Sequence, residues 1–228
     1  MLRKTQLLST GLVLLTASTV NAGFYSGLGL GSDTVDLNVR SRIYEELPGH
    51  PSSFDVINKS HLSATGVFGT LFAGYGTLVH DNYYLAGEAN LNISTTQSRS
   101  YNHEYYHQSF ADTVIKIKNS IGLSILPGYQ FTSNTLFYGR LGITNSTFKE
   151  NTTDISLFNY TTKKTGFRYG LGVKQNITNR LALRMDYSRI DYASINTGTF
   201  DPVGKVRKTT QMTASQQLVE FGLVVNFA

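Results

Sequence analysis

The chain has 228 residues, a formal charge of +5 and no cysteine. Only 15% of its residues are charged while 12% are aromatic, which excludes an intrinsically disordered chain, and the missing cysteines exclude a small secreted domain held by disulfides. Without Arg3 and Lys4 the balance is 18 Lys and Arg against 15 Asp and Glu, or +3, which is too small to indicate a nucleic-acid partner.

The first 22 residues have the pattern of a secretory signal peptide. Arg3 and Lys4 form a basic start, a leucine-rich run follows, and Val20-Asn21-Ala22 offers small residues for cleavage. A membrane anchor is the alternative, but polar residues interrupt the apolar run, which is shorter than the roughly 20 residues of a spanning helix. We predict that 1–22 is a cleaved signal peptide and that 23–228 is the mature domain.

Eight segments follow in which apolar side chains tend to occupy every second position. Such alternation is typical of a strand with one apolar and one polar wall. The segments lie near Phe24–Val39, Leu62–Leu78, Tyr83–Ser98, Thr113–Phe131, Thr135–Phe148, Thr165–Ile177, Arg180–Tyr192 and Ser215–Phe227.

The connections between these segments are of two kinds. Three are short, at 79–82, 132–134 and 178–179, and four are long and polar, at 40–61, 99–112, 149–164 and 193–214. Short turns at one end and long loops at the other are typical of an outer-membrane barrel. We therefore predict an all-β fold, an eight-stranded antiparallel up-and-down transmembrane β-barrel. A soluble lipocalin-like barrel remains the alternative.

The predicted outer wall is apolar and should face lipid. On the fourth segment, for example, Ile115, Ile117, Ile121, Leu123 and Ile125 share this wall. Aromatic residues recur where the strands meet their short turns, and aromatic rings favour the membrane–water boundary. This predicted periplasmic-side girdle comprises Phe24, Tyr75, Tyr83, Tyr129, Phe131, Phe137 and Phe227.

The predicted inner wall is polar, and several of its charges fall at similar depth. Eight strands enclose only enough space for side chains, so opposite charges there should pair and plug the barrel. Gly27, Gly29 and Gly31 on the same wall leave room for long side chains. The predicted interior charge network comprises Glu88, Lys116, Lys118, Arg140, Arg168, Arg184, Asp186 and Glu220.

The last segment alternates from Val219 to Phe227, and we expect it to close the barrel against the first strand. An exported barrel of this kind needs help to insert. We expect the barrel-assembly machinery to bind this C-terminal strand.

Three stretches carry a resemblance to a known family: GFRYGLGVKQNITNRLALRMDYSRIDY (166–192), LPGYQFTSNTLFYGRLG (126–142) and VEFGLVVNF (219–227). They resemble the closing hairpins of OmpA-type outer-membrane barrels, a group that includes the OmpX, Ail and opacity-protein relatives. The resemblance implies the outer membrane of a Gram-negative bacterium, with outer-membrane lipid and lipopolysaccharide as surroundings, no catalytic residues and no cofactor. The sequence departs from the family in placing Ala228 after the terminal Phe227.

Two motifs carry weaker indications of a site. His103 and His107 lie four apart in NHEYYHQ, but that segment is a polar loop without a third ligand, so we expect no metal. Gly27, Gly29 and Gly31 alternate along a strand without a following helix, which does not fit a phosphate-binding loop.

The fourth long loop carries a cationic cluster, Lys205, Arg207 and Lys208. Exposed cations can form charge-assisted bonds with lipopolysaccharide phosphates or sulfated host glycans. A solvated loop tip without a partner is the simpler interpretation.

We expect a monomeric, non-enzymatic barrel whose loops serve in adhesion, in binding other surface ligands, or in envelope integrity. A lipid-A-modifying barrel enzyme is the alternative from another class. It would need histidine with serine or acidic residues on the outer wall near one rim.

Overall fold

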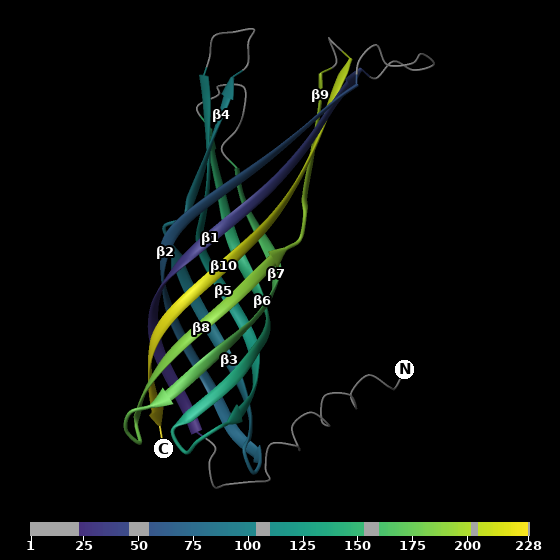
Figure 1. Ribbon diagram of the computed structural model, residues 1–228. Coiled ribbons are helices and arrows are strands. Elements are labelled where there is room, and N and C mark those ends of the chain that lie inside the picture. Colours follow the sequence, from purple (N-terminus) through teal and green to yellow (C-terminus); the bar gives the residue numbers. More distant parts are fainter. Residues whose placement is uncertain (1–22, 46–54, 104–109, 153–159, 202–204, 228) are drawn as a thin grey trace, which may run out of the picture.

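The computed structural model describes residues 23–45, 55–103, 110–152, 160–201 and 205–227 (Figure 1). In these ranges the chain forms antiparallel strands only, which confirms the all-β prediction. None of the described residues forms a helix that could cross a membrane. The strands are β1 (Gly23–Glu45), β2 (Asp55–His80), β3 (Tyr83–Ser94), β4 (Gln97–His103), β5 (Phe110–Gln130), β6 (Thr135–Thr152), β7 (Tyr160–Asn176), β8 (Leu181–Tyr192), β9 (Ile195–Asp201) and β10 (Val206–Phe227).

Eight of these strands close a barrel. The order of neighbours is β1-β2-β3-β5-β6-β7-β8-β10, and β10 pairs with β1 along its whole length, from Phe24 opposite Phe227 to Glu45 opposite Val206. The expected closure by the C-terminal strand is therefore present. All hydrogen-bonding edges are used at this level, as a membrane requires, because hydrocarbon offers no partner to a free edge.

Beyond this ring, β4 follows β3 and β9 follows β8, in each case after an interruption of two residues. In the described part β4 pairs only with β5, and β9 only with β10. The ring therefore opens at this end into two four-stranded sheets, β2-β1-β10-β9 and β4-β5-β6-β7, which diverge at the top of Figure 1.

The predicted long loops were too long. Strand structure occupies much of 40–61, 99–112, 149–164 and 193–214, and only 46–54, 104–109, 153–159 and 202–204 of these segments lie outside the described residues. The alternation of apolar and polar residues weakens here because both faces of a sheet outside the membrane can meet water.

The short turns lie at the opposite end, as predicted. Asp81 and Asn82 join β2 to β3, and Asp81 adopts a positive φ of 41°, a conformation that Asp tolerates better than most residues. The Asn82 side-chain amide donates to the Tyr129 hydroxyl at 3.3 Å, and the Asn82 carbonyl accepts from the Gln130 backbone amide at 2.7 Å.

The outer wall of the ring is apolar and exposed. Leucine, isoleucine, valine and aromatic side chains cover it on all eight strands, far more than a soluble protein leaves in water. Six of the seven predicted girdle residues are exposed, Tyr75 is partly buried, and close ring contacts join Phe24 with Tyr75, Tyr83 with Tyr129 and Phe131 with Phe137. All seven lie at the short-turn end.

One strand departs from the predicted alternation. The register of β5 against β6 shifts between Ile117 and Ser120, and both of these side chains are buried. Lys118 and Asn119 between them are both exposed, as in a β-bulge. The prediction that Ile115 and Ile117 face outward and Lys116 and Lys118 inward is therefore wrong, because the bulge reverses the two walls of β5 beyond it.

Candidate functional site

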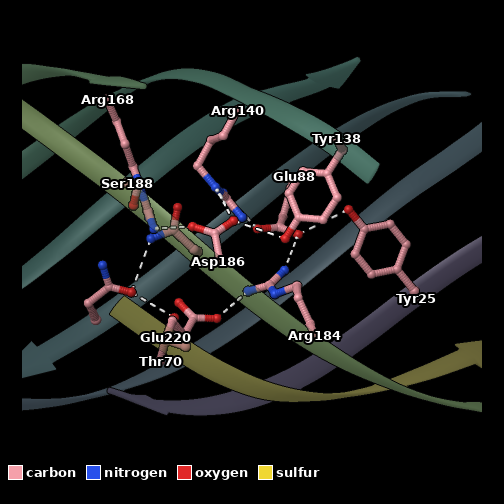
Figure 2. A network of polar contacts seen from close by, with 12 residues as sticks. Tyr25, Thr70, Glu88, Tyr138, Arg140, Arg168, Arg184, Asp186, Ser188 and Glu220 are labelled. Carbon is pink, nitrogen blue, oxygen red and sulfur yellow. Dashed lines mark hydrogen bonds and ion pairs between the residues drawn. The ribbon is translucent and has the colours of Figure 1, made fainter. Parts of the chain in front are cut away.

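The centre of the lumen holds a chain of alternating charges (Figure 2). Arg140 on β6 lies between two carboxylates, with Nη1 2.9 Å from Glu88 Oε1 and Nε 3.0 Å from Asp186 Oδ2. Arg168 extends the chain on one side, 3.6 Å from Asp186, and Arg184 on the other, 2.7 Å from Glu88. Arg184 also bridges to Glu220. Three cations and three carboxylates thus balance in a region that water hardly reaches.

Neutral side chains also contact this network. The Tyr25 hydroxyl donates to Glu88 Oε2 at 3.0 Å, and the Tyr138 hydroxyl donates to Asp186 Oδ2 at 2.9 Å. The Arg184 guanidinium lies 3.5 Å from the centre of the Phe72 ring, in a cation–π contact. Sequence reasoning did not include the tyrosines, although Tyr25 lies on the same wall as Gly27 and Gly29.

Apolar layers lie on both sides of the network. Toward the short turns, one buried cluster comprises Tyr25, Phe72, Ala86, Leu126, Leu136, Tyr138, Ala182 and Val224. Toward the open end a second cluster comprises Val35, Leu37, Phe68, Ile117, Phe148, Ile190, Tyr192, Ala214 and Leu218. A space of about 10 Å³ beside Glu88 and Arg184 has room for one water at most. Among the described residues the network is therefore packed as a plug with little free space beside it.

Asp33 is a buried carboxylate outside the network, and sequence reasoning missed it. It accepts hydrogen bonds from Ser94 Oγ at 2.9 Å, Thr96 Oγ1 at 2.6 Å and Gln216 Nε2 at 2.7 Å, and none of the described cations pairs with it. Ser94 is the last residue of β3, and Thr96 lies in the interruption between β3 and β4. Asp33 therefore holds the point where the ring opens.

The cations at the two ends of the barrel have different surroundings. Near the short turns Lys174 lies 5.5 Å from the ring centres of both Tyr25 and Tyr84. Lys118 is exposed and Lys116 is partly buried on the outer side of β5, so neither belongs to the predicted network. The bulge described above is the physical reason.

The remaining predicted site residues lie at the open end. Lys205 is exposed with a positive φ of 49°, and Arg207 on β10 is partly buried. Lys208 and His103 lie on strands, but their side chains are outside the description, as is the whole of His107. Among the described residues no group of three His, Cys, Asp or Glu could hold a metal. Gly27, Gly29 and Gly31 lie within β1, with no helix following.

Residues 6–227 match the family model described as the outer membrane protein beta-barrel domain. The chain belongs to this family. Membership confirms the prediction of an outer-membrane β-barrel and places the protein in the outer membrane of Gram-negative bacteria. The apolar outer wall of the ring is therefore the wall that faces lipid. No curated protein sequence matches the chain.

Solved structures of outer-membrane proteins match this chain at low sequence identity. The outer membrane protein OprG from Pseudomonas aeruginosa is 17% identical over 91% of this chain and 97% of its own, with a TM-score of 0.54. Ail, the attachment invasion locus protein of Yersinia pestis, is 16% identical over 90% and 99%, with a TM-score of 0.38. The outer membrane protease OmpT from Escherichia coli is 10% identical over 92% and 99%, with a TM-score of 0.45.

Proposed function

We propose that this member of the family is a non-enzymatic surface-binding protein of the outer membrane. In this proposal the barrel is an anchor, its plugged lumen carries nothing, and the two sheets at the open end present a binding surface outside the cell. The same proposal includes a cleaved signal peptide, a monomeric state and insertion through the C-terminal strand. The function that this architecture supports best is adhesion to a surface or maintenance of the envelope.

The observation that carries this proposal is the contrast between the two parts of the barrel. In the described residues, the Glu88–Arg140–Asp186 network and two apolar layers fill the membrane part of the lumen, which supports an anchoring role over that of a pore or an enzyme. Outside it, β1, β2 and β10 continue for many residues beyond their last lipid-facing apolar side chains. Strands of this length serve no purpose in anchoring.

The test is a whole-cell adhesion assay with a shortened β1–β2 hairpin. Val39 and Ser60 are opposite each other, so replacing 40–59 by Asn-Gly should close the hairpin with a two-residue turn and leave the barrel intact. The matched variant replaces 150–160 by Asn-Gly between Lys149 and Thr161, which shortens the other sheet. We expect at least one variant to lose adhesion while both remain heat-modifiable in gels. Full adhesion by both variants would contradict the proposal.

The cationic cluster of Lys205, Arg207 and Lys208 is a proposed contact for polyanions within this surface. Lys205 is exposed and directly precedes Val206, the first residue of β10. Replacing all three by Gln should weaken adhesion to sulfated glycans and leave adhesion to uncharged surfaces unchanged. Unchanged binding to the sulfated glycans would remove the cluster from the proposal.

A lipid-A-modifying enzyme remains the second candidate, because one observation favours it. Asp36, His61 and Ser63 share the outer face of β1 and β2, where Asp36 is directly opposite Ser63 and lies 3.8 Å from His61 Nε2. His61 Nδ1, however, is 2.9 Å from the Asn38 side-chain oxygen, and no hydrogen bond joins His61 to Ser63 in the described part. Mass spectrometry of lipid A from cells with and without the protein decides between the two functions. A mass change that His61→Ala abolishes would establish the enzyme.

A further inference from the structure

Four lysines gather on the outer side of β5, β6 and β7, just beyond the lipid-facing wall. Lys116 and Lys118 lie on β5, Lys149 on β6 and Lys163 on β7. Lys118 and Lys163 are exposed, while Lys116 and Lys149 are partly buried. We refer to these four residues as the lysine ridge.

The bulge in β5 creates this ridge. Regular alternation from Ser120 would turn Lys118 and Lys116 into the lumen, but the extra residue turns them outward. Lys116 is then directly opposite Lys149 across the β5–β6 pair. The fold therefore removes two cations from the lumen and places them beside two others on the outside.

Among the described residues, no carboxylate compensates the charge of the ridge. Like charges directly opposite each other destabilise a sheet, and no described carboxylate lies within ion-pair distance of any of the four lysines. Asp191 on the neighbouring β8 is already engaged, 2.9 Å from Arg189 Nε and 3.0 Å from the Tyr169 hydroxyl. An anion from outside the chain would relieve the repulsion.

The height of the ridge above the membrane indicates which anion this is. Phe167 and Tyr169 stack with their ring centres 6.0 Å apart at the upper end of the apolar wall, where aromatic rings mark the headgroup level. Lys163 lies four residues before Phe167 on β7, toward the open end. For a strand tilted as in outer-membrane barrels, it is roughly 10 Å farther from the membrane centre than Phe167. Lysine stems can also extend back along apolar surface toward the headgroups.

We propose that the lysine ridge binds the phosphate groups of a phosphorylated glycolipid in the outer leaflet. The apolar wall below receives its acyl chains, and the ridge neutralises its phosphates. The continuity between wall and ridge favours a lipid over a soluble polyanion. This proposal rests on the membrane location that the family shows and is independent of binding by the two sheets.

The test measures lipid A bound per barrel. Protein in phosphatidylcholine nanodiscs, with and without diphosphorylated lipid A, is transferred to zwitterionic detergent, and the retained lipid A is quantified by mass spectrometry. The ridge variant is K116Q/K118Q/K149Q/K163Q. The control, R40Q/R42Q/K59Q, removes three positive charges from the opposite sheet, and the four-arginine ridge variant keeps the charge but changes the side chains.

We expect the ridge variant to retain at least about tenfold less lipid A than the native protein, because each lysine near an anionic surface strengthens binding severalfold. The control and the arginine variant should retain native amounts. The surface positions leave folding intact, which heat-modifiable gel mobility verifies. The proposal is overturned by native retention of lipid A in the ridge variant, even where that variant binds a soluble sulfated oligosaccharide less well, or by an equal loss in the control.

Discussion

Arg184 on β8 donates to Glu88 on β3 with 2.7 Å between Nη1 and Oε2, and these strands lie on opposite sides of the eight-stranded ring. The bridge thus spans the lumen. Because Glu88 also meets Arg140 on β6 and Tyr25 on β1, one carboxylate joins four parts of the wall. A barrel cross-braced in this way resists deformation at the level of the membrane.

Glu88→Ala should lower the free energy of unfolding by about 3–5 kcal/mol. The change removes the carboxylate that pairs with both Arg140 and Arg184. Breaking a buried ion pair destabilises a protein mainly because the remaining charge stays buried without its partner. Urea-induced unfolding in lipid vesicles, followed by gel mobility, measures the loss. The matched change is Asp191→Asn, which breaks the exposed bridge to Arg189 and should cost no more than about 1 kcal/mol. Native stability of Glu88→Ala, with a gain in ion conductance, would show that the network gates a pore.

Asp33→Ala should loosen the place where the ring opens. The change leaves Thr96, Ser94 and Gln216 without their acceptor, at a cost of about 1–3 kcal/mol for each buried donor that finds no replacement. Hydrogen exchange should therefore speed up at the interruption between β3 and β4 and remain slow around Glu88. Uniform acceleration through the whole barrel would instead show that Asp33 supports the entire fold.

Gly170→Ala should destabilise the barrel by about 1–3 kcal/mol, as overpacking does elsewhere. A Cβ at this position would lie 2.1 Å from the Tyr187 carbonyl oxygen and 2.7 Å from Ser188 Cα, so the backbone of β8 would have to move. Gly87 on the lipid-facing wall is the matched site, because a Cβ there meets nothing within 4 Å. Thermal unfolding in detergent compares the two variants. Equal stability of both would mean that β7 and β8 can separate freely.

Acid should loosen the outer part of the β1–β2 hairpin. The hydrogen bond from Arg42 lowers the pKa of Asp55, and Nη2 of Arg42 lies 2.7 Å from Asp55 Oδ2. A carboxyl whose pKa falls on folding contributes stability above its unfolded pKa and loses it as the pH falls through the folded value. Amide exchange at the hairpin end should therefore increase below the ordinary pKa range of Asp. Asp55→Asn should abolish this pH dependence, and persistence of the dependence would assign it to another group.

The sequence alone determined the parts of the protein that lipid constrains. Side chains in the membrane must be apolar outside and fit a narrow lumen inside, so alternation revealed the strands, the short turns and the wall that carries Glu88, Arg140 and Asp186. Composition and turn spacing sufficed because this constraint acts on each strand locally.

The tertiary structure decided what depends on register between strands. The bulge at Lys118 and Asn119 is a shift in the register of β5 against β6. The residue pattern of β5 alone does not indicate it. Likewise, Asp33 is held by donors on β3, β10 and the β3–β4 junction, and strands β4 and β9 lie where both faces of a sheet can meet water. Such features follow from cross-strand pairing and from solvent on both faces, which leave no alternation to read in the sequence.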